Sequence, residues 1–333
     1  MTAFFVNLLT WINGVVGNYG WSIVVFTLLI RLVLLPLDIK SKKSMRAMSK
    51  IQPKIQALQK KYANDKEKLN QKTMELYRKE HVSPTAGCLP MLISLPILWI
   101  MFSAMRTLGN EYTIQMLLDM KNTGTLPSLQ SWLWIKNVFQ PDSFAATILP
   151  AVGTNLQMIR PVASSSILTA DNINAVLEYL KSTEYSRLAA QLAPASAFSV
   201  QAIRFLFINT TLTIPNSFAN VFKYGNGLFI LPLLAGASQF LMTKIMNGKQ
   251  TEEQKAAQEA QQADQTNPMN SPVMKWFFPI FSVWICATSN AAFSIYWMAA
   301  NVIQIVQQLA VNWYFERQDA KAAELAAAQD IDD

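Results

Sequence analysis

WSIVVFTLLIRLVLLPL, residues 21–37, is an apolar run that contains a single charged side chain, Arg31. With its flanking residues it reaches the length of about 20 mostly apolar residues that a helix needs to cross a bilayer. A guanidinium stays charged in proteins, and holding one near the bilayer centre costs roughly 2.5–3.5 kcal/mol. The stretch therefore predicts a membrane-spanning helix in which Arg31 serves a function.

The rest of the chain has the same apolar character. Its 333 residues are 51% hydrophobic and 15% charged, whereas soluble domains average about 25% charged residues. Five stretches predict membrane spans: 20–38, 88–106, 228–246, 275–290 and 291–312. The last two form one long run, with a break predicted at Ser289-Asn290. The expected fold class is an all-α polytopic membrane protein with a five-transmembrane-helix core.

Basic residues predict the orientation of these spans. Residues 39–87 hold thirteen Lys and Arg against four acids, whereas the longer segment 107–227 holds seven against six. Short, strongly basic loops stay in the cytoplasm. We therefore expect a multi-pass protein of the bacterial cytoplasmic (inner) membrane, with its N-terminus outside and its C-terminus in the cytoplasm. The net charge of +7 is then mainly a topology signal, and nucleic acid is not expected as a substrate.

The segments between the spans have distinct compositions. Residues 1–19 lack the charged start and small-residue cleavage site of a signal peptide, and predict an extracytoplasmic interfacial helix. The stretch 197–214 is apolar but polar side chains interrupt it, so we expect an interfacial or globular segment there. Residues 247–274 predict a polar cytoplasmic linker, and 313–333 an acidic cytoplasmic tail that begins as a helix and frays.

The basic segment 39–87 predicts a cytoplasmic helical hairpin. Asn64-Asp65 supplies the turn and an N-cap, with Glu67 in the capping-box position. Pro53 either kinks the first arm or opens a new helix. The hairpin is either a solvated tether or a surface for partners and anionic headgroups, and we favour the surface. Apolar residues of the first arm follow a heptad spacing: Met48, Ile51, Ile55, Leu58 and Tyr62.

The chain shows no pattern typical of an enzyme. It has no nucleophile–base pair, phosphate-binding glycine loop or metal-ligand cluster. His81 is the only histidine, and a disulfide between Cys88 and Cys286 is not expected because the two lie at different depths of different spans. We therefore expect no catalytic residue, no cofactor and no metal.

Uncharged polar side chains mark the predicted spans. Thr27 lies one helical turn before Arg31, Ser94 and Ser103 lie in the second span, and Ser238 and Gln239 in the third. Taken singly, such residues usually form hydrogen bonds between helices. The last span has a polar stripe at helical spacing: Ser294, Trp297, Asn301, Gln304 and Gln308.

Arg31 needs a different explanation, because no countercharge lies within the spans. The nearest acid on its helix face is Asp38, about 10 Å further along the axis. The side chain could extend towards the cytoplasm, but we favour a hydrated cavity open to the cytoplasm.

Three stretches are similar to the YidC/Oxa1/Alb3 membrane protein insertases: NYGWSIVVFTLLIRLVLLPL (18–37), the hairpin and second span (43–97), and MKWFFPIFSVWICATSNAAFSIYWMAANVIQIVQQ (274–308). The resemblance is strongest to bacterial members without a large periplasmic domain. It implies a five-helix core around a hydrophilic groove that opens to the cytoplasm and to lipid.

The resemblance also implies roles for individual residues. Arg31 matches the groove arginine, and Thr27 and Trp297 match positions that contact the inserting segment. Gln239 is a further groove match, and residues 40–86 match the hairpin that insertion requires. The complete expected substrate groove consists of Arg31, Thr27, Trp297, Gln239, Asn301 and Ser94.

The chain departs from the family pattern at several points. A Pro-Gly pair common before the last span is replaced in the stretch 290–296, and a common Gln of the second span is Ser94. Residues 133–150 resemble the lead-in to the third span, yet that span comes much later, so 151–226 is predicted to be an insertion. The acidic tail lacks the basic extension with which some members hold ribosomes, which argues against ribosome binding.

The expected function is an ATP-independent insertase and chaperone. Its partners would be membrane lipids and nascent membrane proteins with acidic extracytoplasmic tails, and whether the Sec translocon assists stays open. One alternative is a small-anion transporter or channel that uses Arg31 as its anion site, although no internal repeat supports it. Another is an assembly scaffold in which the hairpin is a docking arm.

Overall fold

The computed structural model describes residues 2–80, 89–150, 159–205, 208–246 and 272–332. These residues are mostly helical, in agreement with the predicted class, and form two compact units. Unit 1 comprises Met1–Leu28, Ile100–Thr243 and Lys275–Ile303. Unit 2 comprises Leu29–Trp99, Lys244–Met274 and Gln304–Asp333. The predicted linker 247–274 lies mostly outside the described residues, as do His81 and Cys88.

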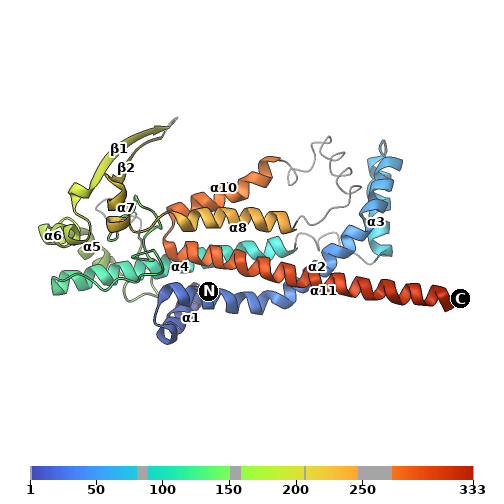
Figure 1. Ribbon diagram of the computed structural model, residues 1–333, viewed down its shortest axis with the longest axis horizontal. Helices are drawn as coiled ribbons and strands as arrows, with labels where there is room; N and C mark the ends of the chain where they lie inside the picture. The colour runs from blue at the N-terminus through green and yellow to red at the C-terminus, as the bar shows by residue number, and fades with distance from the viewer. Residues whose placement is uncertain (1, 81–88, 151–158, 206–207, 247–271, 333) are drawn as a thin grey trace. The chain divides into compact units, whose positions relative to one another are not determined.

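The elements follow one another along the chain as labelled in Figure 1. The long helices are α2 (Tyr19–Lys61), α4 (Leu89–Thr123) and α11 (Ala291–Asp332). The shorter helices are α1 (Thr2–Val16), α3 (Lys66–Lys79), α5 (Ala170–Tyr179), α6 (Thr183–Leu192), α7 (Phe218–Tyr224), α8 (Ile230–Met246) and α10 (Pro272–Thr288). A short 3₁₀ helix (Ala195–Ala197) precedes strands β1 (Phe198–Phe205) and β2 (Ile208–Pro215).

Within the described residues, one helical stretch is long and apolar enough to cross a membrane, Tyr19–Ser44 of α2. This stretch contains the apolar run 21–37, from which the sequence predicts a membrane-spanning helix. Helices α8 and α10 have 17 residues each, which corresponds to about 25 Å, and a hydrocarbon core is about 30 Å thick. The number of five spans therefore stays a prediction.

Two prolines do not interrupt α2. Pro36 and Pro53 both lie inside this 43-residue helix. The alternative that Pro53 opens a new helix is therefore wrong. Each proline removes one backbone donor, but the helix continues on both sides of the missing hydrogen bond.

Unit 2 contains the hairpin formed by the end of α2 and by α3 (Figure 1). Asp65 is the N-cap of α3, because its side chain accepts a hydrogen bond of 3.0 Å from the backbone N–H of Lys68. The helix thus begins one residue later than a capping box built on Asn64 requires. Ile51 and Ile55 are buried, and Leu58 and Tyr62 are half-buried. Four of the five side chains of the predicted heptad are therefore buried or half-buried.

Unit 1 contains a helical bundle in which α4, α8, α10 and the start of α11 contact one another. The ring of Phe102 on α4 meets that of Phe293 on α11 edge to face, with 5.0 Å between centroids. The amide of Asn290, between α10 and α11, donates to the carbonyl of Met105 at 3.3 Å. The hydroxyl of Ser294 donates to the carbonyl of Cys286 at 3.0 Å. Polar contacts thus supplement the apolar core at the α10–α11 turn.

A buried polar network holds the beginning of α8. Asp142 is fully buried, and its carboxylate accepts backbone hydrogen bonds from Leu228 at 2.8 Å, Phe229 at 3.2 Å and Leu231 at 2.7 Å. The indole N–H of Trp134 also donates to this carboxylate, at 3.3 Å. The first N–H groups of a helix have no partner within the helix. Asp142, from a distant part of the chain, satisfies the N–H of Leu231 in the first turn of α8 and those of the two residues just before the helix.

The same loop also holds the beginning of α11. The backbone N–H of Ala291 donates to the carbonyl of Gln140 at 2.9 Å, and that of Ala292 to the carbonyl of Val138 at 2.7 Å. Two helices that are far apart in the sequence are thus oriented by residues 138–142. This arrangement explains why an irregular loop is largely buried: it supplies the caps of both helices.

Residues that precede the predicted insertion 151–226 lie close to its last residues. Asn226 exchanges hydrogen bonds with the backbone of Asn137, and its own N–H donates to the carbonyl of Ala146 at 3.0 Å. An isolated bridge joins Thr147 to Gly225. A segment inserted into an existing fold must begin and end at nearby points. That residues 151–226 are such an insertion stays a prediction.

A second core in unit 1 covers the end of α4. Helix α4 continues to Thr123, well past the predicted end of its span at residue 106. Its last turns pack against α5 and α6 (Figure 1). The apolar periodicity of these helices explains the packing, because their buried side chains recur at helical spacing: Ile114, Leu117 and Met120 on α4, Ile173, Val176 and Tyr179 on α5, and Tyr185 and Leu188 on α6.

The segment 197–214 forms most of an antiparallel strand pair, which departs from the all-α expectation. Phe198 pairs with Pro215 and Phe205 with Ile208. The sequence of β2, INTTLTIP, is rich in β-branched residues, and that of β1, FSVQAIRF, contains two β-branched and two aromatic residues. Both kinds of residue favour extended backbone.

Gly109 offers a test of the bundle packing. A β-carbon there would overlap with the side-chain nitrogen Nδ2 of Asn290. The side-chain oxygen Oδ1 of the same residue caps α11, because it accepts a hydrogen bond of 3.0 Å from the backbone N–H of Phe293. We expect Gly109→Ala to lower the free energy of unfolding by about 1–3 kcal/mol, because the core is overpacked and the cap is displaced. Thermal unfolding in detergent, followed by circular dichroism, measures the change.

Gly14 on α1 is the matched control for this substitution. A β-carbon at Gly14 meets no atom within 4 Å, and alanine favours a helix interior over glycine by about 0.5–1 kcal/mol. Gly14→Ala should therefore leave stability unchanged or raise it. Equal losses from the two variants would contradict the close approach of α4 to Asn290.

Candidate functional site

Arg31, the residue with the strongest functional signal in the sequence, lies in unit 2 and is half-buried. Its guanidinium forms no ion pair with any residue that the structure describes. The charge of Arg31 interacts with that of Asp38, the acid on the same helix face, but the two do not form a salt bridge. The site therefore has a positive charge that interacts with Asp38 but forms no salt bridge with it.

Gln307 on α11 brings a second unsatisfied group next to Arg31. Its Nε2 donates to the backbone carbonyl of Arg31 at 3.3 Å. Its Oε1 is buried and has no hydrogen-bond partner within the described chain. A buried amide oxygen without a donor costs free energy, so this position suits water or a ligand with an N–H or O–H group.

Gln307 is the residue that the sequence reasoning missed. The polar stripe predicted on this helix includes Gln304 and Gln308, which are both half-buried. Gln307 lies one helical turn after Gln304, so the spacing alone was compatible with it. The spacing of polar residues did not show which glutamine of α11 contacts Arg31, because that contact depends on how α2 and α11 pack.

Thr27 is buried in unit 1. Its hydroxyl donates to the carbonyl of Ile23 at 2.6 Å, one turn earlier on α2. The hydroxyl proton is thus used within the helix, whereas the oxygen can still accept a hydrogen bond. Thr27 can therefore act towards a ligand as an acceptor.

Trp297 on α11 has an unpaired donor. Its indole ring lies 5.5 Å from the ring of Phe293, centroid to centroid. Its Nε1 is buried and has no acceptor among the described residues. A buried indole N–H usually finds a partner, so this one can donate to water or to a carbonyl of a visiting chain.

Asn301 and Gln239 behave differently from one another. The Asn301 amide donates to the hydroxyl of Ser238 at 3.0 Å and so joins α11 to α8. The side chain of Gln239 is half-buried and forms no hydrogen bond with the described residues. Asn301 thus has a structural contact that accounts for its burial, whereas Gln239 keeps its amide free.

The predicted groove residues are divided between the two units. Unit 1 holds Thr27, Gln239, Trp297 and Asn301, and unit 2 holds Arg31. Ser94 lies on α4, and the placement of its side chain is outside the described structure, as is that of Met48 on α2. The structure brings Asn301 into contact with Ser238 and Gln307 into contact with Arg31. A single groove formed by all six residues stays a prediction.

The hairpin of unit 2 carries its own charge pairs. The ammonium of Lys54 on α2 lies 2.6 Å from the Glu80 carboxylate just after α3, and joins the two arms. The hydrogen bond and positive charge of Lys54 lower the pKa of Glu80. Because the pKa of this carboxyl is lowered, the pairing is fully present above the ordinary carboxyl range and is lost as the pH falls. The pair is exposed, so it orients the hairpin more than it stabilises it.

Comparison with known proteins assigns the family. The family model of the 60Kd inner membrane protein matches residues 11–181 and 175–318. A protein of Fusobacterium nucleatum subsp. nucleatum named membrane protein insertase YidC is 43% identical over 141 residues, which are 42% of this chain and 60% of the relative. A protein of Caldanaerobacter subterraneus subsp. tengcongensis with the same name is 49% identical over 101 residues, which are 30% of this chain and 49% of the relative.

A third relative of the same name, from Bordetella pertussis, is 42% identical over 112 residues, or 32% of this chain and 20% of the relative. The matched part thus spans between one fifth and three fifths of these three relatives. Because the family model covers most of the sequence, the chain belongs to the 60Kd inner membrane protein family.

Proposed function

We propose that this member of the 60Kd inner membrane protein family is a membrane protein insertase and chaperone that works without ATP. Three relatives with the insertase name support the class of activity. The observation that carries the proposal is the half-buried guanidinium of Arg31, which has no ion pair within the described chain. A charge held at this cost in an apolar helix suits a partner that comes and goes.

In this proposal, Arg31 transiently pairs with an acidic residue in the short extracytoplasmic tail of a substrate. The unpaired oxygen of Gln307 beside it would hold water or a backbone N–H of the tail. A hydrated environment for the tail lowers the cost of moving polar groups into the bilayer. The pairing need not be tight, because the tail must leave again on the outer side.

The hydrophobic effect and the membrane potential supply the work. Transfer of the apolar helix of a substrate into lipid is favourable by roughly 25 cal/mol per Å² of buried apolar surface. Outward movement of one negative charge is favoured by about 2.3 kcal/mol per 100 mV. Trp297, with its unpaired indole N–H, would contact the substrate as its helix moves out towards lipid.

The cytoplasmic hairpin would receive the substrate first. Its surface is strongly basic, since thirteen of the residues in 39–87 are Lys or Arg, and such a surface attracts anionic headgroups and acidic segments. The predicted topology, with five spans and an outer N-terminus, places this hairpin in the cytoplasm. The predicted partners are therefore nascent membrane proteins and the lipids around them.

Reconstitution tests the proposed class of activity. The purified chain in phospholipid vesicles should insert a single-spanning substrate with an acidic outer tail in the absence of nucleotide, as measured by protease protection. Vesicles without protein are the control. Chloride flux through the same vesicles, with no insertion, would instead favour the anion transporter.

Crosslinking tests the path of the substrate. A photoreactive residue in place of Trp297 should crosslink to the nascent chain, whereas the same residue in place of Trp284, which is 60% exposed on α10, should crosslink mainly to lipid. Equal crosslinking of the nascent chain from both positions would contradict a defined contact at Trp297.

A further inference from the structure

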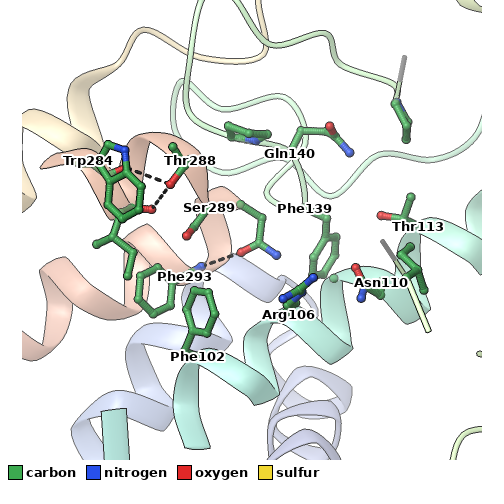
Figure 2. A pocket seen from close by; sticks show the side chains of 16 residues that line it. Phe102, Arg106, Asn110, Thr113, Phe139, Gln140, Trp284, Thr288, Ser289 and Phe293 are labelled. Carbon is green, nitrogen blue, oxygen red and sulfur yellow. Dashed lines mark hydrogen bonds between the residues drawn. The ribbon is translucent and has the colours of Figure 1, made fainter. Parts of the chain in front are cut away.

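A cavity in unit 1 is lined by none of the residues assigned to the proposed groove. It has a volume of about 450 Å³ and is bordered by α4, by the loop around Gln140, and by the α10–α11 turn (Figure 2). Pockets for small ligands usually measure about 300–1,000 Å³. The cavity is thus large enough for a polar headgroup but not for a folded segment of protein.

Among the described residues that line this cavity, Arg106 has the only charged side chain. It forms no ion pair or hydrogen bond with the residues that the structure describes. Asn110 and Thr113 follow it on the same face of α4, and Figure 2 shows the three side chains along the edge of the cavity. A permanent positive charge among neutral polar groups favours an anion.

Further hydrogen-bonding groups at the cavity lack partners. Thr113 is buried, and its hydroxyl forms no hydrogen bond within the described chain. The side-chain amides of Asn110 and Gln140 likewise form none with described residues. Several unused groups around one cation suit an oxygen-rich anion such as a phosphate, which accepts hydrogen bonds from both guanidinium and amide donors.

The rest of the cavity wall is aromatic. Phe102 and Phe139 lie near Arg106, and Trp284 stands at the α10 side (Figure 2). Trp284 is 60% exposed, and α10 also exposes Trp276 and Ile280, at 58% and 63%. An exposed apolar helix face next to a polar cavity fits a ligand with a charged head and an apolar tail.

We propose that this cavity binds the phosphate-bearing headgroup of a membrane phospholipid. Arg106 holds the phosphodiester, Asn110, Thr113 and Gln140 provide hydrogen bonds, and the acyl chains lie along Trp284 and the exposed face of α10. The depth agrees with this assignment, because Arg106 and Ser289-Asn290 stand where two predicted spans end, and tryptophan is enriched at that level of a bilayer. The site is separate from the residues assigned to insertion.

Arg106→Gln tests the headgroup site. The variant should bind phosphatidylglycerol about five- to tenfold more weakly in detergent micelles, as measured by titration of the lipid with native mass spectrometry. Arg106 is exposed and has no partner within the described chain, so the fold should tolerate the change. Arg106→Lys should retain part of the affinity, because the charge remains but the paired donors do not.

Arg187→Gln is the matched control. Arg187 is exposed on α6 and does not line the cavity, so its loss should leave lipid binding unchanged. Diacylglycerol, which lacks the phosphate, should bind equally weakly to the wild type and to Arg106→Gln. Equal losses of affinity for phosphatidylglycerol in Arg106→Gln and Arg187→Gln would overturn the proposal that the cavity binds the headgroup.

Competition distinguishes a lipid from other anions. Inorganic phosphate should compete only weakly with phosphatidylglycerol, because it cannot use the aromatic wall. Competition by inorganic phosphate as strong as that by a soluble short-chain phosphatidylglycerol would overturn the lipid assignment in favour of a simple anion site. Stronger competition by an acidic peptide than by short-chain lipid would overturn it in favour of a protein ligand.

Discussion

Arg31→Ala is expected to reduce the insertion of a single-spanning substrate with an acidic outer tail on the order of 10- to 100-fold. A charge-assisted hydrogen bond contributes about 1.5–3 kcal/mol, and the substitution removes the cation that would form it. Protease protection in reconstituted vesicles gives the initial rate.

Arg31→Lys separates charge from geometry. Lysine keeps the positive charge but not the planar set of donors, so much of the activity should remain if charge alone matters. Lys43→Ala is the matched control, because it removes an exposed positive charge from the same helix, and insertion should hardly change.

The tail of the substrate provides an independent check. Replacement of its acidic residues by Asn or Gln should remove the difference between the wild type and Arg31→Ala. Full activity of Arg31→Ala with the acidic tail would show that Arg31 does not pair with the substrate. Loss of chloride flux in this variant, without any effect on insertion, would favour the transporter instead.

Asp142→Asn is expected to lower the free energy of unfolding by about 3 kcal/mol or more. The carboxylate is fully buried, and its two oxygens accept hydrogen bonds from three backbone N–H groups at the beginning of α8 and from an indole. An amide in either orientation would place an N–H₂ group against one of these donors. Breaking a buried hydrogen bond of a charged group costs more than a neutral one.

Asp171→Asn is the matched control for Asp142→Asn. Asp171 is exposed in the first turn of α5, where a negative charge contributes only about 0.3–1 kcal/mol. Thermal unfolding in detergent compares the two variants. Similar stabilities for both would show that Asp142 does not hold α8 in place.

Insertion activity adds a second measurement for Asp142. The carboxylate belongs to unit 1, whereas the hairpin and Arg31 belong to unit 2. We therefore expect Asp142→Asn to inactivate the protein only at temperatures where it unfolds. Inactivation of the fully folded variant would instead indicate a direct role of this loop in insertion.

Local sequence was sufficient where neighbours along the chain decide the structure. The run 21–37 predicts an apolar helix, and α2 contains it. The hairpin follows from the heptad spacing and the turn, and Asp65 caps the return helix only one residue from the expected cap. The family resemblance, now supported by the family model, was likewise contained in short stretches of sequence.

Other features depend on residues that are distant in the sequence. Asp142 bonds to Leu228 and its neighbours across the whole of the predicted insertion, and Gln307 bonds to Arg31 from the other end of the chain. The strands β1 and β2 had no helical periodicity, yet only their pairing identified them as a hairpin. The cavity at Arg106 combines three separate segments, so composition gave no sign of it.

Arg31 shows where this boundary lies. Its charge within an apolar helix follows from the sequence, because the number of apolar neighbours and the absence of nearby acids are local properties. The absence of an ion pair between Arg31 and any described residue depends on the tertiary fold, and so does the absence of a described donor to the side-chain oxygen of Gln307. Hydrophobic periodicity specifies which face of a helix is buried, but only the packing of helices decides which polar groups meet and which are left without partners.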